Sequence, residues 1–222
     1  MTGLRGVEAV LFDMDGTLID SEGLTERAVA EMLRERGLSD RGLDYKRFHG
    51  ITWAQTRDLL VERYPALADE RLDPMLQQRF HRLLVEAPPP LIRGAAEAVA
   101  AAGELLPTAL VSSSNRQSVE HAMGRLGLLG RFRLTICAED CTRSKPDPQC
   151  YLLAAGKLDV APRRCLVFED SLAGIQAARS ATMMTVAVAA GRPHAALADL
   201  RIADYTELPP GFFATVAGEG AP

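Results

Sequence analysis

The sequence predicts an α/β fold in which helices cover both faces of a parallel sheet and an all-helical cap domain is inserted near the start. From residue 94 onward, short runs that are apolar on both faces alternate with helical segments. This pattern is typical of a parallel sheet that is buried on both sides. Between residues 20 and 90 the periodicity is helical, with little strand signal. We therefore expect a core of residues 1–18 and 91–222 and a cap of residues 19–90.

The core elements follow from local composition. Short Val-, Ile-, Leu- and Phe-rich runs predict strands, and apolar residues three or four apart predict helices. Gly127 ends one expected helix, Pro148 stands in the first turn of the next, and the tail 214–222 is expected to fray. In chain order we expect a strand at 9–12, a helix at 95–104, a strand at 108–111, a helix at 117–126, a strand at 134–137, a helix at 148–157, a strand at 166–168, a helix at 172–180 and a final strand at 184–188, forming a Rossmann-like sheet.

Three helices are expected in the cap, at residues 24–36, 53–64 and 74–85. Three consecutive prolines at 88–90 cannot continue a helix and form a stiff spacer before the chain returns to the sheet. Because the insertion begins directly after the first strand, the cap is well placed to act as a lid over the carboxyl edge of the sheet.

Composition excludes several classes of function. A formal net charge of −4 over 222 residues argues against nucleic acid or an anionic membrane surface as a partner. No apolar stretch approaches the ~20 residues that a bilayer requires, and residues 1–6 lack the apolar region of a secretory signal. The four cysteines show no zinc-type spacing and are expected to be reduced thiols. We expect a cytoplasmic protein.

Two carboxylates follow the first expected strand, in the run Asp-Met-Asp-Gly-Thr at 13–17. Asp13 and Asp15 are two residues apart, so they project to the same side of an extended chain. They reach the edge where open α/β sheets bind ligands. Paired acids there suit a hard cation, or a division of nucleophilic and proton-transfer roles. The alternatives are a solvated turn and an EF-hand loop, and the run lacks the later ligands of such a loop.

Three later strand ends carry polar groups as well. Ser112, Ser113, Ser114 and Asn115 follow the second strand. Ser114 or Asn115 can cap the next helix, and the donors that remain there can also bind an anion. Lys145 lies in an Arg-Ser-Lys-Pro-Asp-Pro run, whose prolines stiffen the backbone around the ammonium group, although such a run is also ordinary helix-start punctuation.

Glu169 and Asp170 follow the fourth strand and either cap a helix or face the first acid pair. Four carboxylates packed at one edge repel each other, and a divalent cation is the expected remedy. Oxygen ligands without His or Cys select Mg²⁺ over zinc or copper. The metal, Lys145 and the hydroxyl donors together suit a dianion such as phosphate.

With these motifs in this order, the chain resembles the haloacid dehalogenase superfamily, specifically its Mg²⁺-dependent, β-phosphoglucomutase-like phosphatases with a helical cap. The resemblance implies an aspartyl-phosphate mechanism with Asp13 as the nucleophile and Asp15 as the acid and base. It implies catalytic roles for Ser112 and Lys145 as well. The implied metal ligands are Asp13, Asp15 through its backbone carbonyl and Asp170, with Glu169 near the metal or behind its direct ligands. The candidate substrate-binding residues are Met14, Gly16, Thr17, Glu22, His49, Gly50, Ser113 and Asn115.

The expected substrate is a small phosphorylated metabolite, above all a sugar or polyol phosphate, and the expected assembly is a monomer or weak homo-oligomer. A sugar phosphomutase is the nearest alternative. Its cap loop would carry basic residues for a second phosphate, whereas Trp53 and Ala54 stand where an Arg and an acid are expected. A non-catalytic relative that binds a phosphometabolite is the second alternative. His81 is expected on a solvated helix face.

Overall fold

The computed structural model describes residues 3–68, 70–188 and 191–218. Its described part contains a six-stranded sheet in the order β3-β2-β1-β4-β5-β6, in which every neighbouring pair is parallel. The order reverses at β1, which lies between β2 and β4, and ligands bind at such a switch point in open α/β sheets. The strands are β1 (Ala9–Phe12), β2 (Thr108–Val111), β3 (Leu134–Ile136), β4 (Cys165–Glu169), β5 (Met184–Val188) and β6 (Leu200–Ile202).

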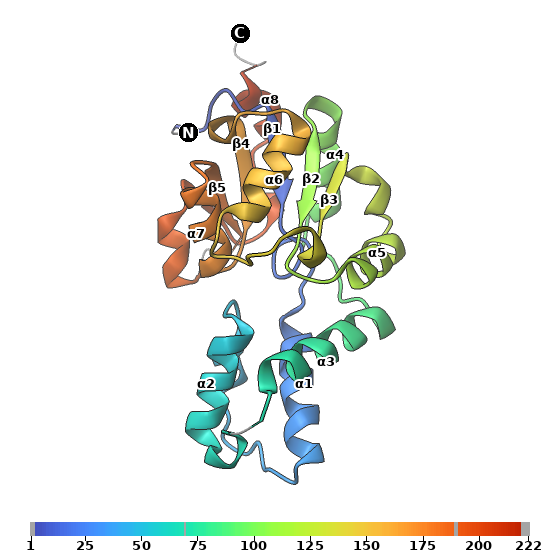
Figure 1. Cartoon of the computed structure of the whole chain (residues 1–222). Helices are drawn as coiled ribbons and strands as arrows, with labels where there is room; N and C mark the ends of the chain where they lie inside the picture. The colour runs from blue at the N-terminus through green and yellow to red at the C-terminus, as the bar shows by residue number, and fades with distance from the viewer. Residues whose placement is uncertain (1–2, 69, 189–190, 219–222) are drawn as a thin grey trace.

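Alternate residues of β1 enter two different hydrophobic layers. Ala9 and Leu11 pack with residues of α6 (Gln149–Leu158) and α7 (Leu172–Ser180). Val10 and Phe12 pack with residues of α4 (Ala95–Leu105), α5 (Arg116–Arg125) and α8 (Phe212–Ala217). The ring of Phe12 stacks on Phe168 of β4 with 5.0 Å between centroids. The predicted fold, helices on both faces of a parallel sheet, is confirmed (Figure 1).

The inserted segment contains α1 (Glu22–Glu35), α2 (Trp53–Arg63) and α3 (Leu72–Glu86), which lie below the sheet in Figure 1. These helices have a hydrophobic cluster of their own, to which α1 contributes Val29, Met32 and Leu33. The residues from α1 lie three or four positions apart and share one helix face. The predicted all-helical cap is therefore present, and α2 begins with a capping box formed by Thr52 and Gln55.

Two expectations for the C-terminal part were wrong. β5 is not the last strand, because β6 pairs beside it at the sheet edge. With only three residues and Arg201 in the middle, β6 lacks the apolar run that identifies a buried strand. Residues 214–217 do not fray but continue α8, since Phe212, Phe213 and Val216 are buried against the core. Residues 219–222 of that expected tail lie outside the described residues. None of the helices in the described residues is long and apolar enough to cross a membrane.

Candidate active site

The sheet brings the polar strand ends together. Phe12 of β1 pairs with Phe168 of β4 and with Leu110 of β2, so the next residues of all three strands meet at one edge. The backbone N–H of Asp13 donates to the carbonyl oxygen of Phe168 at 3.0 Å, which fixes the first acid beside the end of β4. Convergence of these carboxyl ends is a direct result of parallel register.

Lys145 lies at the centre of the cluster. Its Nζ donates to Asp13 Oδ1 at 2.6 Å, to Glu169 Oε1 at 2.7 Å and to the carbonyl oxygen of Val111 at 3.2 Å. Burial alone would lower the pKa of this lysine, but the carboxylates of Asp13 and Glu169 raise it well above its usual value. Lys145 is therefore a fixed ammonium group, held by two acids.

Both oxygens of Glu169 carry hydrogen bonds. The hydroxyl of Tyr151 donates to Oε1 at 2.9 Å, and the backbone N–H groups of Asp170 and Ser171 donate to Oε2 at 3.0 Å each. Burial would raise the pKa of Glu169, but Lys145 and these donors together lower it below its usual value. Glu169 is thus an ionised carboxylate that organises its neighbours.

Three buried acids form a group that fits a metal ion. Asp13, Glu169 and Asp170 offer oxygen atoms that all lie within 4.8 Å of one another. Burial raises the pKa of Asp13 to about 8, although Lys145 opposes this, and burial together with Glu169 raises that of Asp170 well above its usual value. One ammonium group does not balance three buried carboxylates, and a hard divalent cation would.

Two glycines leave room for the carboxylates of this group. Gly16 has φ +76°, and a Cβ on it would lie 2.3 Å from Asp170 Oδ2. At Gly174, in the first turn of α7, a Cβ would lie 1.7 Å from Glu169 Oε1. The site therefore depends on these glycines for the positions of Asp170 and Glu169.

We expect Gly174→Ala to destabilise the fold by about 1–3 kcal/mol, because the added methyl group must displace a buried, fully hydrogen-bonded carboxylate. The matched control is Gly156→Ala in α6, where a Cβ meets nothing within 4 Å. It should be neutral or stabilising by up to about 1 kcal/mol. Urea unfolding measures both, and equal stability of the two variants would contradict the close packing of Glu169 on α7.

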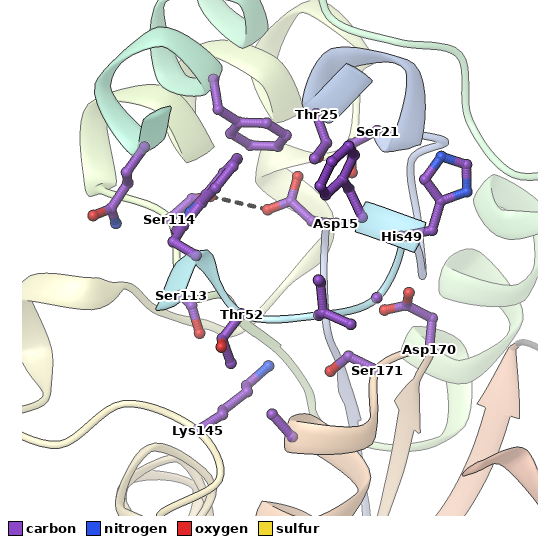
Figure 2. A pocket seen from close by; sticks show the side chains of 18 of the residues that line it. Asp15, Ser21, Thr25, His49, Thr52, Ser113, Ser114, Lys145, Asp170 and Ser171 are labelled. Atoms are coloured by element: carbon purple, nitrogen blue, oxygen red, sulfur yellow. Dashed lines mark hydrogen bonds between the residues drawn. The ribbon is translucent and has the colours of Figure 1, made fainter. Parts of the chain in front are cut away.

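Asp15 occupies a different environment from Asp13. The hydroxyl of Ser114 donates to Asp15 Oδ2 at 2.9 Å, and Figure 2 shows the two side chains pointing toward each other. Asp15 Oδ1 is buried without a hydrogen-bond partner in the described part of the chain. Burial raises the pKa of Asp15 to about 6. The carboxyl can therefore exchange a proton near neutral pH.

The remaining predicted residues divide into two groups. Gly16, Glu22, His49, Gly50 and Ser113 line a pocket of about 450 Å³ together with the acid cluster. Ser112 is not among the lining residues and is 3% exposed. Its Oγ accepts a hydrogen bond from the backbone N–H of Ser114 at 3.0 Å. Thr17 is buried, and its hydroxyl lies 3.4 Å from Asp170 Oδ1. The side chain of Met14 is fully buried in the core, so only its backbone can face a ligand.

Asn115 serves two structural contacts. Its Oδ1 accepts from the backbone N–H of Ser118 and caps α5, and its Nδ2 lies 2.6 Å from His81 Nδ1. His81 was expected on a solvated face, but it lines the pocket and joins α3 to the sheet domain. His49 is held between Glu22 and Glu26, at 2.9 and 2.8 Å.

Sequence reasoning missed several residues at the site. Ser114 was expected to cap a helix or to help bind an anion, and its hydroxyl instead donates to Asp15. Arg192 forms an ion pair with Glu22, and its Nη1 lies 3.5 Å from Asp170 Oδ2. It follows the last expected strand, where no motif directs attention to it. Asp73 and Gln77 of α3 also line the pocket, and their spacing of four was the one available signal.

Comparison with known proteins identifies the family to which this chain belongs. A model of the haloacid dehalogenase-like hydrolases matches residues 7–182. Hexitol phosphatase B of Escherichia coli K12 is 34% identical over 216 residues, which cover 94% of this chain and 97% of that protein. The 6-phosphogluconate phosphatase of the same strain is 32% identical over 185 residues, which cover 80% of each protein. A HAD family hydrolase from Deinococcus radiodurans, solved with phosphate and sodium, is 28% identical with a TM-score of 0.73, covering 98% of this chain and 99% of that one.

An α/β core with an inserted helical cap and a pocket of carboxylates around a buried lysine define a capped hydrolase. The chain belongs to the haloacid dehalogenase-like hydrolases, which confirms the resemblance seen in its four motifs. It is an enzyme of the phosphoric monoester hydrolase class, as the match to phosphatases over most of its length indicates.

Proposed function

We propose that this enzyme is a Mg²⁺-dependent phosphatase of small sugar or polyol phosphates, acting through an aspartyl-phosphate. The observation that carries the proposal is the buried Lys145, which bridges Asp13 and Glu169 in the same pocket as Asp15. The names of the curated relatives, a hexitol phosphatase and a 6-phosphogluconate phosphatase, support the substrate class. We take residues 19–90 as the cap that closes over the pocket.

In the proposed reaction, a carboxylate oxygen of Asp13 attacks phosphorus and the ester P–O bond breaks. Asp15 gives its proton to the leaving alkoxide, for which a pKa of about 6 is suitable. Asp15 then takes a proton from the water that attacks the aspartyl-phosphate, which releases inorganic phosphate and regenerates Asp13. Lys145 stabilises the negative charge on the phosphoryl oxygens while the phosphoryl group is transferred to Asp13 and then released as phosphate.

Mg²⁺ would be held by the carboxylates of Asp13 and Asp170 and by the backbone carbonyl of Asp15, with Glu169 beside it. When bound, it supplies positive charge that neutralises the phosphate and the acids around it. The three buried carboxylates, with oxygen atoms within 4.8 Å of one another, fit such an ion.

The pocket does not favour the mutase alternative. A mutase holds a second phosphate, which requires basic groups on the cap side. Among the described residues that line the pocket, the only lysine or arginine is Lys145, and Asp13 and Glu169 already engage it. This distribution of charge therefore fits simple hydrolysis better than it fits a mutase.

The test is phosphate release from a panel of phosphorylated metabolites, with Mg²⁺ and with a chelator. We expect turnover of sugar and polyol phosphates with Mg²⁺ and a loss of at least about 10²-fold with the chelator. Turnover that continues unchanged in the presence of the chelator would contradict the metal requirement.

Glucose 1-phosphate with catalytic glucose 1,6-bisphosphate tests the mutase alternative, since a mutase gives glucose 6-phosphate in place of free phosphate. A non-catalytic relative would bind members of the panel and release nothing.

A further inference from the structure

The cap side of the pocket carries a stripe of polar side chains on α3. Asp73, Gln77 and His81 are spaced by four residues, so they lie above one another on one helix face. All three line the pocket that contains the acid cluster. The one other residue of α3 among the described residues that line this pocket is Phe80, so the stripe supplies the polar groups of α3 that a substrate can reach.

The three members of the stripe offer complementary hydrogen-bonding groups. Asp73 Oδ2 accepts from Arg57 Nη1 at 3.1 Å, and its Oδ1 has no hydrogen-bond partner within the described residues. Gln77 provides an amide that both donates and accepts. Asn115 Nδ2 can only donate to His81 Nδ1, which leaves the ring proton on Nε2 as a donor. Burial lowers the pKa of His81 and so keeps the ring neutral.

The charge around the stripe is negative. Six acids line the described pocket, and Lys145 is its one lysine or arginine. Among the described residues, Arg192, just outside, already pairs with Glu22 and Asp170. Arg57 already pairs with Asp73. A divalent cation at the acid cluster would already be bound to the phosphate that is transferred. A second anionic group on the leaving side of a substrate would therefore face the carboxylate of Asp73 without an unpaired guanidinium group beside it.

Two aromatic rings complete this end of the pocket. Trp53 of α2 and Phe80 of α3 meet edge to face with 5.6 Å between centroids, and both line the pocket. An apolar surface beside mixed donors and acceptors suits a carbon chain that carries hydroxyls, whose C–H groups pack on rings while its O–H groups bond to amides and carboxylates.

We propose that Asp73, Gln77 and His81 bind the hydroxyls of a neutral polyhydroxylated leaving group, and that Asp73 excludes substrates with a second anionic group. The inference rests on the proposed phosphatase function and narrows its substrate class. Asp73 and Gln77 are thereby specificity-determining residues, and the chemistry they select is an uncharged polyol or sugar rather than a sugar acid or bisphosphate.

The test compares two ligands of equal length, glucitol 6-phosphate and 6-phosphogluconate, which differ by CH₂OH against carboxylate at one end. Binding is measured by calorimetry with Mg²⁺ on an Asp13→Asn background, so that turnover does not interfere. We expect glucitol 6-phosphate to bind about tenfold more tightly, because the carboxylate of Asp73 repels the carboxylate of the other ligand in a partly buried site. Adding Asp73→Asn should reduce this preference to about threefold or less.

Asp58→Asn is the matched control, because Asp58 pairs with the same Arg57 but does not line the pocket. It should leave the preference unchanged, and thermal melting confirms that both variants fold. Gln77→Leu should weaken the binding of glucitol 6-phosphate by about three- to tenfold. Equal binding of the two ligands, a preference that Asp73→Asn does not change, or no binding of either ligand would overturn the inference. Failure of the proposed function is a separate result, seen as no phosphate release by the unsubstituted enzyme.

Discussion

Asp13→Asn is expected to abolish phosphate release, with kcat reduced by about 10⁴-fold or more. The amide has almost the same shape as the carboxylate, but it cannot attack phosphorus and brings no charge to a metal. Asp13 is 6% exposed and its carboxylate receives Lys145 at 2.6 Å, so no neighbouring acid can replace it in the same position. Single-turnover and steady-state phosphate release measure the effect.

Two controls make this result specific to the nucleophile. Asp20→Asn changes an exposed acid seven positions along the chain and outside the pocket lining, and should retain full activity. In the native enzyme, acid quench during turnover should trap phosphate on the peptide that contains Asp13, and the Asn variant should trap none. Full turnover by Asp13→Asn, or trapped phosphate on another peptide, would exclude the proposed mechanism.

The sequence was sufficient for the architecture because the strands that form the centre of the sheet have unambiguous composition. Ala9–Phe12 is fully buried on both faces, and that burial requires the apolar run by which it was recognised. β6 lies at the edge of the sheet and has three residues, and α8 has six residues, so both elements carry little periodic signal. Their formation depends on tertiary contacts, such as the burial of Phe213, that no local pattern encodes.

The site divides in the same way. Residues at strand ends, such as Asp13 and Glu169, could be brought together from topology, because parallel strands deliver their carboxyl ends to one edge. Ser112 and Ser114 could not be distinguished, since both follow the same strand and only side-chain geometry shows which one holds Asp15. The pocket-lining residues of α3 were the least predictable part of the site. They reach the pocket through the packing of α3 over the sheet, which leaves no motif in the sequence.

The second large effect is expected from Lys145→Met, in stability as well as activity. Lys145 is 7% exposed, and its removal leaves Asp13 and Glu169 buried together without their shared cation. Loss of one partner from a buried ion pair costs about 3–5 kcal/mol, because the remaining charges stay desolvated and repel each other. Urea unfolding in the presence of a chelator measures this cost without a contribution from bound metal.

The matched control for Lys145 is Arg164→Met, which removes a cation from the ion pair with Glu8 on the surface. Both partners of that pair are about half exposed, at 47% and 50%, so water screens the lost charge and the expected cost is about 0–1 kcal/mol. Arg164→Met should also keep full phosphatase activity, whereas Lys145→Met should lose at least about 10³-fold, since phosphate then lacks its fixed ammonium partner. If both substitutions proved equally mild, the buried lysine would not be the centre of the site, and the charge balance on which the mechanism rests would be wrong.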